Sequence, residues 1–293
     1  MLKAIQAELY KLFKNRTFKV LICVAVLLST LTVVMCSSVF EKILNDSLGN
    51  MPQDQKEVLM EQLTSMSESE AIVTPGQLGI QLQAKDMMNP TSIEVYHASF
   101  GSGVIEIIIG ILVGALIAKE YSQGTIKNFL AYGKRREEFY LAKFVSMVIA
   151  VTIILAVMTI LPTIVVTLMN GWGKAFEISQ LLGMIKTFVA SVIAGSAVAA
   201  LAMIIATLVK GNGATIGITV AIFIGIPTLA GFLYGIYSWF DRVYEVLPFY
   251  NSALATSIKA GNGDLLRSVI ISLVTIAISL FVGIKIFKSQ DIK

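Results

Sequence analysis

The chain has 293 residues, of which 56% are hydrophobic and only 14% are charged, and its net charge is +4. Its mean hydropathy is +0.78. A soluble chain of this length carries about a quarter charged residues, so the composition excludes a water-soluble globular protein. It predicts an all-α membrane protein with several spanning helices. The single histidine, His97, has no Cys or His companion, so we expect no metal site.

The N-terminal stretch, residues 1–16, is amphipathic and basic. Apolar side chains recur in it at helical spacing: Leu2, Ile5, Leu9, Leu12 and Phe13. This pattern predicts a helix that lies in the plane of the membrane surface. A signal peptide fits poorly, because the uncharged run over 20–40 is longer than a typical signal core. We therefore expect the first spanning helix at 18–39.

Further apolar segments follow and predict a total of six spanning helices in a single transmembrane domain over 1–293. The later spans are expected at about 98–118, 144–168, 181–208, 214–236 and 268–287. The two long polar stretches are interpreted as extracellular loops, an acidic one over 41–97 and an aromatic one over 237–267. With both termini inside, the inner segments hold more than twice as many Lys and Arg residues as the outer segments. The rule thus predicts cytoplasmic termini.

Small residues inside the spans predict how these helices pack. Small residues recur four positions apart at Gly110 and Gly114, at Ala190 and Ala194, and at Gly231 and Gly235. Such spacing lets helix backbones approach closely, so these positions should face other helices.

Two charges also fall within spans, Glu106 at ~12 Å and Lys186 at ~8 Å from the outer ends at a rise of ~1.5 Å per residue. Glu106 is expected on the translocation path or at a helix interface, with Lys186 as an intramembrane partner or extended to the surface.

The segment 119–143 is a polar, basic stretch between two apolar spans. It begins with the acid Glu120, passes through Gly124 and Thr125, and continues with the apolar residues Ile126, Phe129 and Leu130 before a run of basic residues. We expect a short in-plane helix over 120–132 on the cytoplasmic side. Gly124 should permit a non-helical backbone angle, Thr125 should cap the helix, and Glu120 should hold the N-terminal helix through a Lys or Arg. The N-terminal helix, with Glu8 and Lys11, is expected to pack beside this segment. The simpler alternative is an ordinary positively charged loop.

Motifs for chemistry are absent from the sequence. No phosphate loop of the form GxxxxGK[ST] occurs, and neither a GxSxG nor an HExxH motif is present. We therefore expect no enzyme activity in this chain. If the protein transports a substrate with the energy of ATP, that energy must enter from a partner.

The segment after the second span resembles the corresponding segment of ABC-2 type permeases, the membrane subunits of bacterial ABC exporters. The matching residues are Glu120, Gly124, Thr125, Leu130, Arg135 or Arg136, and Lys143. The basic N-terminus, the six expected spans and a loop with Pro248 before the last span are also similar to that family. The chain looks most similar to the branch that confers resistance to, or exports, bacitracin- and lantibiotic-type peptides.

This resemblance implies a homodimer or a heterodimer with a related permease, in the bacterial cell membrane, with two copies of a cytosolic ABC ATPase. ATP and Mg²⁺ would bind the ATPase, this chain would hold no cofactor of its own, and its surroundings would be lipid and protein rather than nucleic acid. The residues expected to couple to the ATPase are Glu120, Gly124, Thr125, Ile126, Phe129 and Leu130. The cargo would be an antimicrobial peptide or another amphipathic or lipid-like substrate. An autonomous secondary transporter or channel without an ATPase is the alternative.

Overall fold

The computed structural model describes residues 1–36, 46, 49, 51–52, 54–55, 58, 72–84, 89–126, 135–173 and 175–290. The named elements of these residues are helices, and one isolated bridge pairs Gly79 with Ser102. Five helices are long and apolar enough to cross a membrane. They are α2 (Arg16–Met35), α9 (Arg136–Asn170), α10 (Ile178–Val209), α11 (Asn212–Gly231) and α14 (Asn262–Ser289). The protein is therefore an all-helical, multi-pass membrane protein.

The second expected span is helical, but its helix changes type. Helix α6 (Val104–Val113) continues directly into the π-helix η1 (Gly114–Ala118) and then into α7 (Lys119–Ser122). Short π segments inside α-helices occur frequently at functional sites. Because of this change, the segment contains no single long α-helix like those of the other spans.

Several predicted boundaries differ from the observed ones by a few residues, and two of these differences have a clear local cause. Helix α9 begins at Arg136, eight residues before the expected start at 144, and Glu137 and Glu138 occupy its first turn. Acidic residues are favourable at a helix N-terminus, which extends this helix beyond its apolar part. Helix α11 ends at Gly231 rather than at 236, because the chain enters a run of turns there.

The N-terminal helix α1 (Leu2–Lys14) confirms the expected helix over 1–16, and it ends at Asn15. The Asn15 side chain accepts hydrogen bonds from the backbone N–H groups of Thr17 (2.8 Å) and Phe18 (3.4 Å) and so caps α2. The face of α1 that packs on α9 is formed by Ala4, Glu8 and Leu12. A carboxylate thus lies in the middle of the buried face.

Helix α10 is the centre of the bundle and packs against α14, α9 and α6. Small residues lie at helix contacts: Ala190 and Ala194 of α10 are buried, and a side chain at Gly114 of η1 would meet Ile216 and Asn212 of α11. The prediction that these positions face other helices is confirmed for them. It is wrong for the other stripe, because Gly231 lies against the backbone of Pro75 and Gly235 has open space around it.

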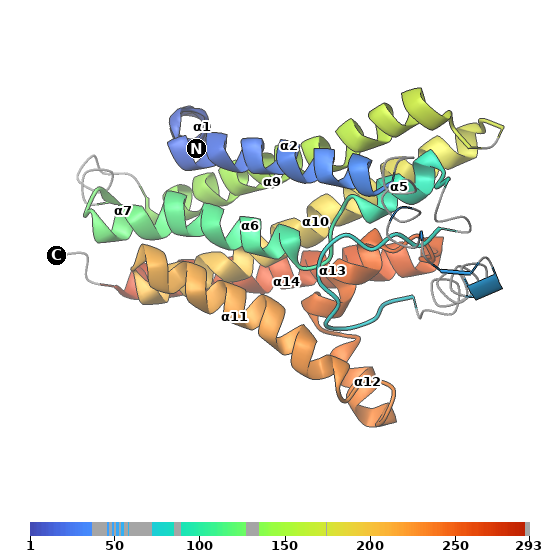
Figure 1. Ribbon diagram of the computed structural model, residues 1–293. Helices are drawn as coiled ribbons and strands as arrows, with labels where there is room; N and C mark the ends of the chain where they lie inside the picture. The colour runs from blue at the N-terminus through green and yellow to red at the C-terminus, as the bar shows by residue number, and fades with distance from the viewer. Residues whose placement is uncertain are drawn as a thin grey trace.

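The two ends of the bundle differ (Figure 1). Helices α1 and α7 and the end of α14 lie at the left, whereas α5 (Ser92–Ala98), α12 (Ser238–Tyr244) and the end of α9 lie at the right. The expected loop over 237–267 contains α12 and a second short helix, α13 (Pro248–Thr256), which packs against α10 and α14. About half of the expected loop over 41–97 lies outside the described residues, and its longest described parts are 72–84 and 89–97.

Candidate functional site

Lys143 is a buried cation near the start of α9, with only 2% of its surface exposed. Its Nζ lies 2.5 Å from Glu8 Oε2 of α1 and 2.8 Å from Glu120 Oε1 of α7. It also donates a hydrogen bond to the Leu116 carbonyl in η1, at 3.2 Å. An ammonium group has three N–H donors, and here each has an acceptor. One side chain therefore joins α1, the π segment, α7 and α9.

Lys11 completes this group, which we call the inner cluster: Glu8, Lys11, Glu120 and Lys143. Its Nζ lies 2.8 Å from Glu8 Oε1 and 3.2 Å from Glu120 Oε1. Partial burial lowers the pKa of Lys11, but its hydrogen bond to Glu8 and the charges of Glu120 and Glu8 together raise that pKa above 10.5. Two carboxylates and two ammonium groups thus alternate, and the cluster carries no net charge. The expectation that Glu120 holds the N-terminal helix through a cation is confirmed.

The turn after α7 is closed by a glycine. Gly124 has φ +66°, a left-handed angle that glycine adopts without strain. The N–H of Thr125 donates to the Glu120 carbonyl (3.2 Å), and that of Gly124 donates to the Tyr121 carbonyl (3.2 Å). These two bonds form a Schellman motif, which ends a helix. The predicted non-helical angle at Gly124 is confirmed, and the Thr125 hydroxyl also donates to the Glu120 carbonyl, at 3.4 Å.

The same turn corrects the predicted in-plane helix over 120–132. Residues 120–122 belong to α7, which continues the membrane helix, and the chain turns over 123–125 before Ile126. Ile126 is helical and buried. Phe129 and Leu130 lie outside the described residues. The prediction was wrong for the first part of the segment because the Schellman motif separates the helix of Glu120 from Ile126.

Arg136, at the basic end of the segment 119–143, binds the end of α14. Its guanidinium donates to the carbonyls of Phe287 (3.1 Å), Lys288 (2.9 Å) and Gln290 (2.8 Å) at the end of α14. Carbonyls at a helix C-terminus lack partners within the helix and bind cations favourably. The segment is therefore connected to α14 as well as to α1 and α9.

A polar cavity of about 290 Å³ lies beside the inner cluster. All four members of the cluster line it, and Lys119, Gln123 and Thr125 lie on its exposed side. The cavity gives water or a partner's polar side chain access to the cluster.

Glu106 and Lys186, the two charges expected within spans, have different partners. Glu106 is buried, and its Oε1 accepts a hydrogen bond from the Ser252 hydroxyl of α13 at 2.9 Å. Lys186 is exposed and donates to Asn262 Oδ1 at 3.1 Å. The predicted pair is wrong, because similar depth does not fix the direction in which each side chain points. Both side chains bond to elements that come after α11 in the chain: α13 for Glu106 and the start of α14 for Lys186.

The sequence interpretation placed the N-terminal helix, with Glu8 and Lys11, beside this segment, but it missed that Lys143 is buried and pairs with Glu8. The signal was present: Glu8 is the one acid of an otherwise basic helix, and Lys143 directly precedes a long uncharged run. A lysine beside an apolar span needs a carboxylate if it is buried, and Glu8 and Glu120 are acids that the same sequence places at the same membrane surface.

The comparisons with known proteins find a family model described as "Protein of unknown function (DUF2705)", which matches residues 57–293. No curated protein matches the chain. The matched range contains Glu106, Glu120 and Lys143 and begins after α1 and α2, so Glu8 and Lys11 lie outside it.

Proposed function

The chain belongs to the DUF2705 family, and we propose that it is the membrane-spanning permease subunit of an ATP-driven exporter of the ABC-2 type. The observation that carries this proposal is the inner cluster. Its ion pairs connect the surface helix α1, the end of the second span and the start of α9. Force applied by a cytosolic partner to any of these elements would reach the others.

The cluster suits such a contact because it is tightly constrained. Ion pairs that are buried and fully hydrogen-bonded resist separation, and removing one partner costs roughly 3–5 kcal/mol. The Schellman turn at Gly124 fixes where the chain leaves α7, and Arg136 attaches the returning chain to the end of α14. Residues 123–126 thus leave the bundle from a firmly held point, and the rest of the coupling segment continues from them.

A six-span topology with both termini in the cytoplasm fits this function. The helical segment from Val104 to Ser122 is about 28 Å long at ~1.5 Å per residue. That length is close to the ~30 Å hydrocarbon core, so we count it as the sixth span. The end with α1 and α7 carries Lys3, Lys11, Lys14 and Lys119, in agreement with a cytoplasmic location. The membrane would be the bacterial plasma membrane.

The cargo we propose is an antimicrobial peptide or another amphipathic, lipid-like molecule. The support is the same residue pattern from Glu120 to Lys143 that resembles the permeases of peptide resistance systems. Two permease chains and two ATPase chains would form the complex, with ATP and Mg²⁺ bound by the ATPase.

Co-purification and transport assays test this function. The chain, extracted from its native membrane in mild detergent, should retain a soluble protein that carries a GxxxxGK[ST] motif, and vesicles holding the complex should transport substrate only with ATP. Glu120→Lys should abolish transport while ATP hydrolysis continues, because it breaks the inner cluster. Ser122→Lys is the matched control, since it places a lysine at an exposed neighbour on α7 outside the described lining of the cavity. Transport without ATP by a chain that retains no ATP-binding partner would overturn the proposal.

An autonomous secondary transporter is a second candidate, and one observation favours it. Glu106 is buried within the bundle, and its Oε2 has no hydrogen-bond partner among the described residues. Ionisable groups at such depth mark ion or proton pathways in transporters. This candidate predicts substrate movement driven by an ion gradient and abolished by Glu106→Gln, in vesicles that contain this chain alone.

A further inference from the structure

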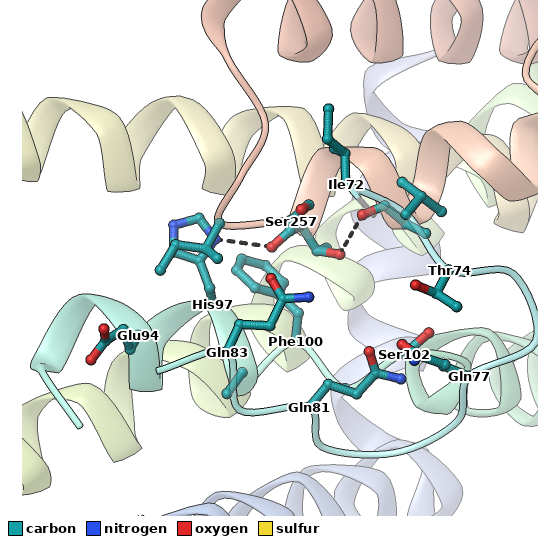
Figure 2. Close-up of a pocket in the computed structure, with 16 residues that line it drawn as sticks. Ile72, Thr74, Gln77, Gln81, Gln83, Glu94, His97, Phe100, Ser102 and Ser257 are labelled. Atoms are coloured by element: carbon teal, nitrogen blue, oxygen red, sulfur yellow. Dashed lines mark hydrogen bonds between the residues drawn. The ribbon is translucent and has the colours of Figure 1, made fainter. Parts of the chain in front are cut away.

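A polar cavity of about 70 Å³ lies near α5, at the end of the bundle opposite the inner cluster. Figure 2 shows the residues that line it. The segment 72–84 crosses over it and is fixed to the start of the second span by the Gly79–Ser102 bridge, with backbone hydrogen bonds of 2.8 and 2.9 Å. This segment supplies Gln77, Gln81 and Gln83, and α5 supplies His97. The cavity wall is therefore rich in uncharged hydrogen-bonding groups.

A second cavity of about 50 Å³ adjoins the first and leads deeper into the bundle. The deeper cavity contacts Glu106 and Ser252, and Phe223 and Phe249 pack edge to face beside it with ring centroids 5.1 Å apart. Tyr244 adds a third ring to its lining. The two cavities share several lining residues, among them Thr74, Gln77, Phe100, Ser102 and Thr256.

The charged residues in the described lining of this double cavity are acidic. Among the described residues that line it, none is Lys or Arg, whereas Glu94 and Glu106 are both present. Burial lowers the pKa of His97, although its hydrogen bond to the Thr256 carbonyl (2.9 Å) acts in the opposite direction. His97 is therefore neutral at pH 7, and because a carbonyl accepts only, its Nδ1 carries the proton.

Glu106 is the residue that requires an explanation. It is buried, it lines the deeper cavity, and Ser252 satisfies its Oε1 only. Its Oε2 is buried without a partner among the described residues. A buried carboxylate oxygen without a donor costs about 1–3 kcal/mol, and more when charged. A donor that enters through the cavity would remove this cost.

We propose that the double cavity binds the protonated amine of an organic ligand, with Glu106 as its counterion. The ammonium N–H groups would donate to Glu106 Oε2, and the rings of Phe223, Phe249 and Tyr244 would surround the cationic head. A carboxylate beside aromatic faces is the environment that recognises organic ammonium groups. The cavities hold a few waters at about 30 Å³ each, so an aminoalkyl group fits whereas a whole peptide does not.

The aromatic rings that line the deeper cavity favour an organic ammonium group over a metal ion. A hard cation such as Ca²⁺ takes six to eight oxygen ligands, and the rings of Phe223 and Phe249 offer none. Among the described residues, no group of three or more His, Cys, Asp or Glu side chains could hold a metal. This binding site goes beyond the proposed function, and it is tested on the chain alone, so its failure leaves the ATPase question untouched.

Calorimetric titration of the purified full-length protein in detergent at pH 7.5 with n-propylammonium chloride tests the site. We expect saturable binding to the wild type and at least tenfold weaker binding to Glu106→Gln, because the substitution removes the counterion and keeps the shape. Glu177→Gln is the matched control, since Glu177 is an exposed carboxylate near the outer ends of α9 and α10 and the variant retains its capping oxygen. Sodium chloride and tetramethylammonium chloride, which lacks N–H donors, should give no comparable heat.

The proposal is overturned if Glu106→Gln binds propylammonium as tightly as the wild type, or if the folded wild type binds only sodium or nothing. Should Glu106→Gln fail to fold, Phe249→Leu replaces it. That variant keeps the carboxylate and removes one ring, so we expect propylammonium binding about 2–5-fold weaker, from a cation–π contribution of about 0.5–1 kcal/mol. Unchanged affinity in Phe249→Leu would then reject the aromatic site.

Discussion

The inner cluster and the outer cavity both contain buried ionisable side chains, but they differ in how completely these side chains are hydrogen-bonded. At the inner end, Lys143 satisfies Glu8 and Glu120 and uses its third donor on the Leu116 carbonyl. At the outer end, Glu106 has one bond from Ser252 and, among the described residues, one oxygen without a donor. A closed network holds elements in a fixed relation, whereas an open acceptor in a cavity is ready for a ligand. This difference matches the two proposals, in which the inner end transmits force and the outer end recognises a molecule.

The largest effect should come from opening the inner cluster. Lys143→Met removes the buried cation that pairs with Glu8 and Glu120 and leaves them only the half-exposed Lys11, so we expect the free energy of unfolding to fall by about 3–5 kcal/mol. Unfolding of the purified protein in a denaturing detergent measures it. Adding Glu8→Gln to Lys143→Met should recover part of the loss, because it removes the carboxylate that lost its buried partner. Lys119→Met, at an exposed position of α7, is the control and should change stability by less than about 0.5 kcal/mol.

A substitution at Glu106, at the outer end, should raise the stability of the protein rather than lower it. Glu106→Gln replaces a buried carboxyl group by an amide that carries no charge at any pH, and because an unpartnered buried group costs more when it is charged, we expect the protein to become more stable, by about 1–3 kcal/mol. The same unfolding assay at pH 7.5 without amine measures it. If Glu106→Gln destabilises the protein as strongly as Lys143→Met does, the two ends do not differ and Glu106 is a structural residue.

The helix contact at the π segment tests whether packing also makes the inner region rigid. A Cβ at Gly114 would lie 2.6 Å from Ile216 Cγ1 and 2.7 Å from Asn212 Oδ1. Gly114→Ala should therefore cost about 1–3 kcal/mol through overpacking. Gly217→Ala is the matched control on the facing helix, because a Cβ there meets nothing within 4 Å. Alanine is the better helix former, so the control should be neutral or slightly stabilising. Equal effects of the two variants would contradict close packing at Gly114.

The sequence predicts the helices and turns at the two ends better than it predicts which side chains from different helices meet. Apolar runs indicate the spans, and the order of residues after the second span indicates a glycine turn and an acid that holds α1, as Gly124 and Glu120 do. The burial of Lys143 escapes such reasoning, because it depends on Glu8, which is far away in sequence. The wrong pairing of Glu106 has the same origin. Spacing gives depth along a helix, but only the packed position of α13 decides that Ser252 reaches Glu106.

The smallest effect concerns pH at the outer cavity. The pKa of His97 is lower in the folded protein than the ordinary 6.5, so the unfolded chain binds more protons in the window below 6.5. Stability should therefore fall as pH decreases from about 6.5 toward the lower folded pKa, by at most about 1.4 kcal/mol per pH unit. Thermal unfolding of the wild type and His97→Gln at pH 7.5 and 5.5 measures this difference. The wild type should lose more stability than the variant, since glutamine does not titrate. An equal loss in both proteins would assign the acid sensitivity to other groups and leave His97 without a part in it.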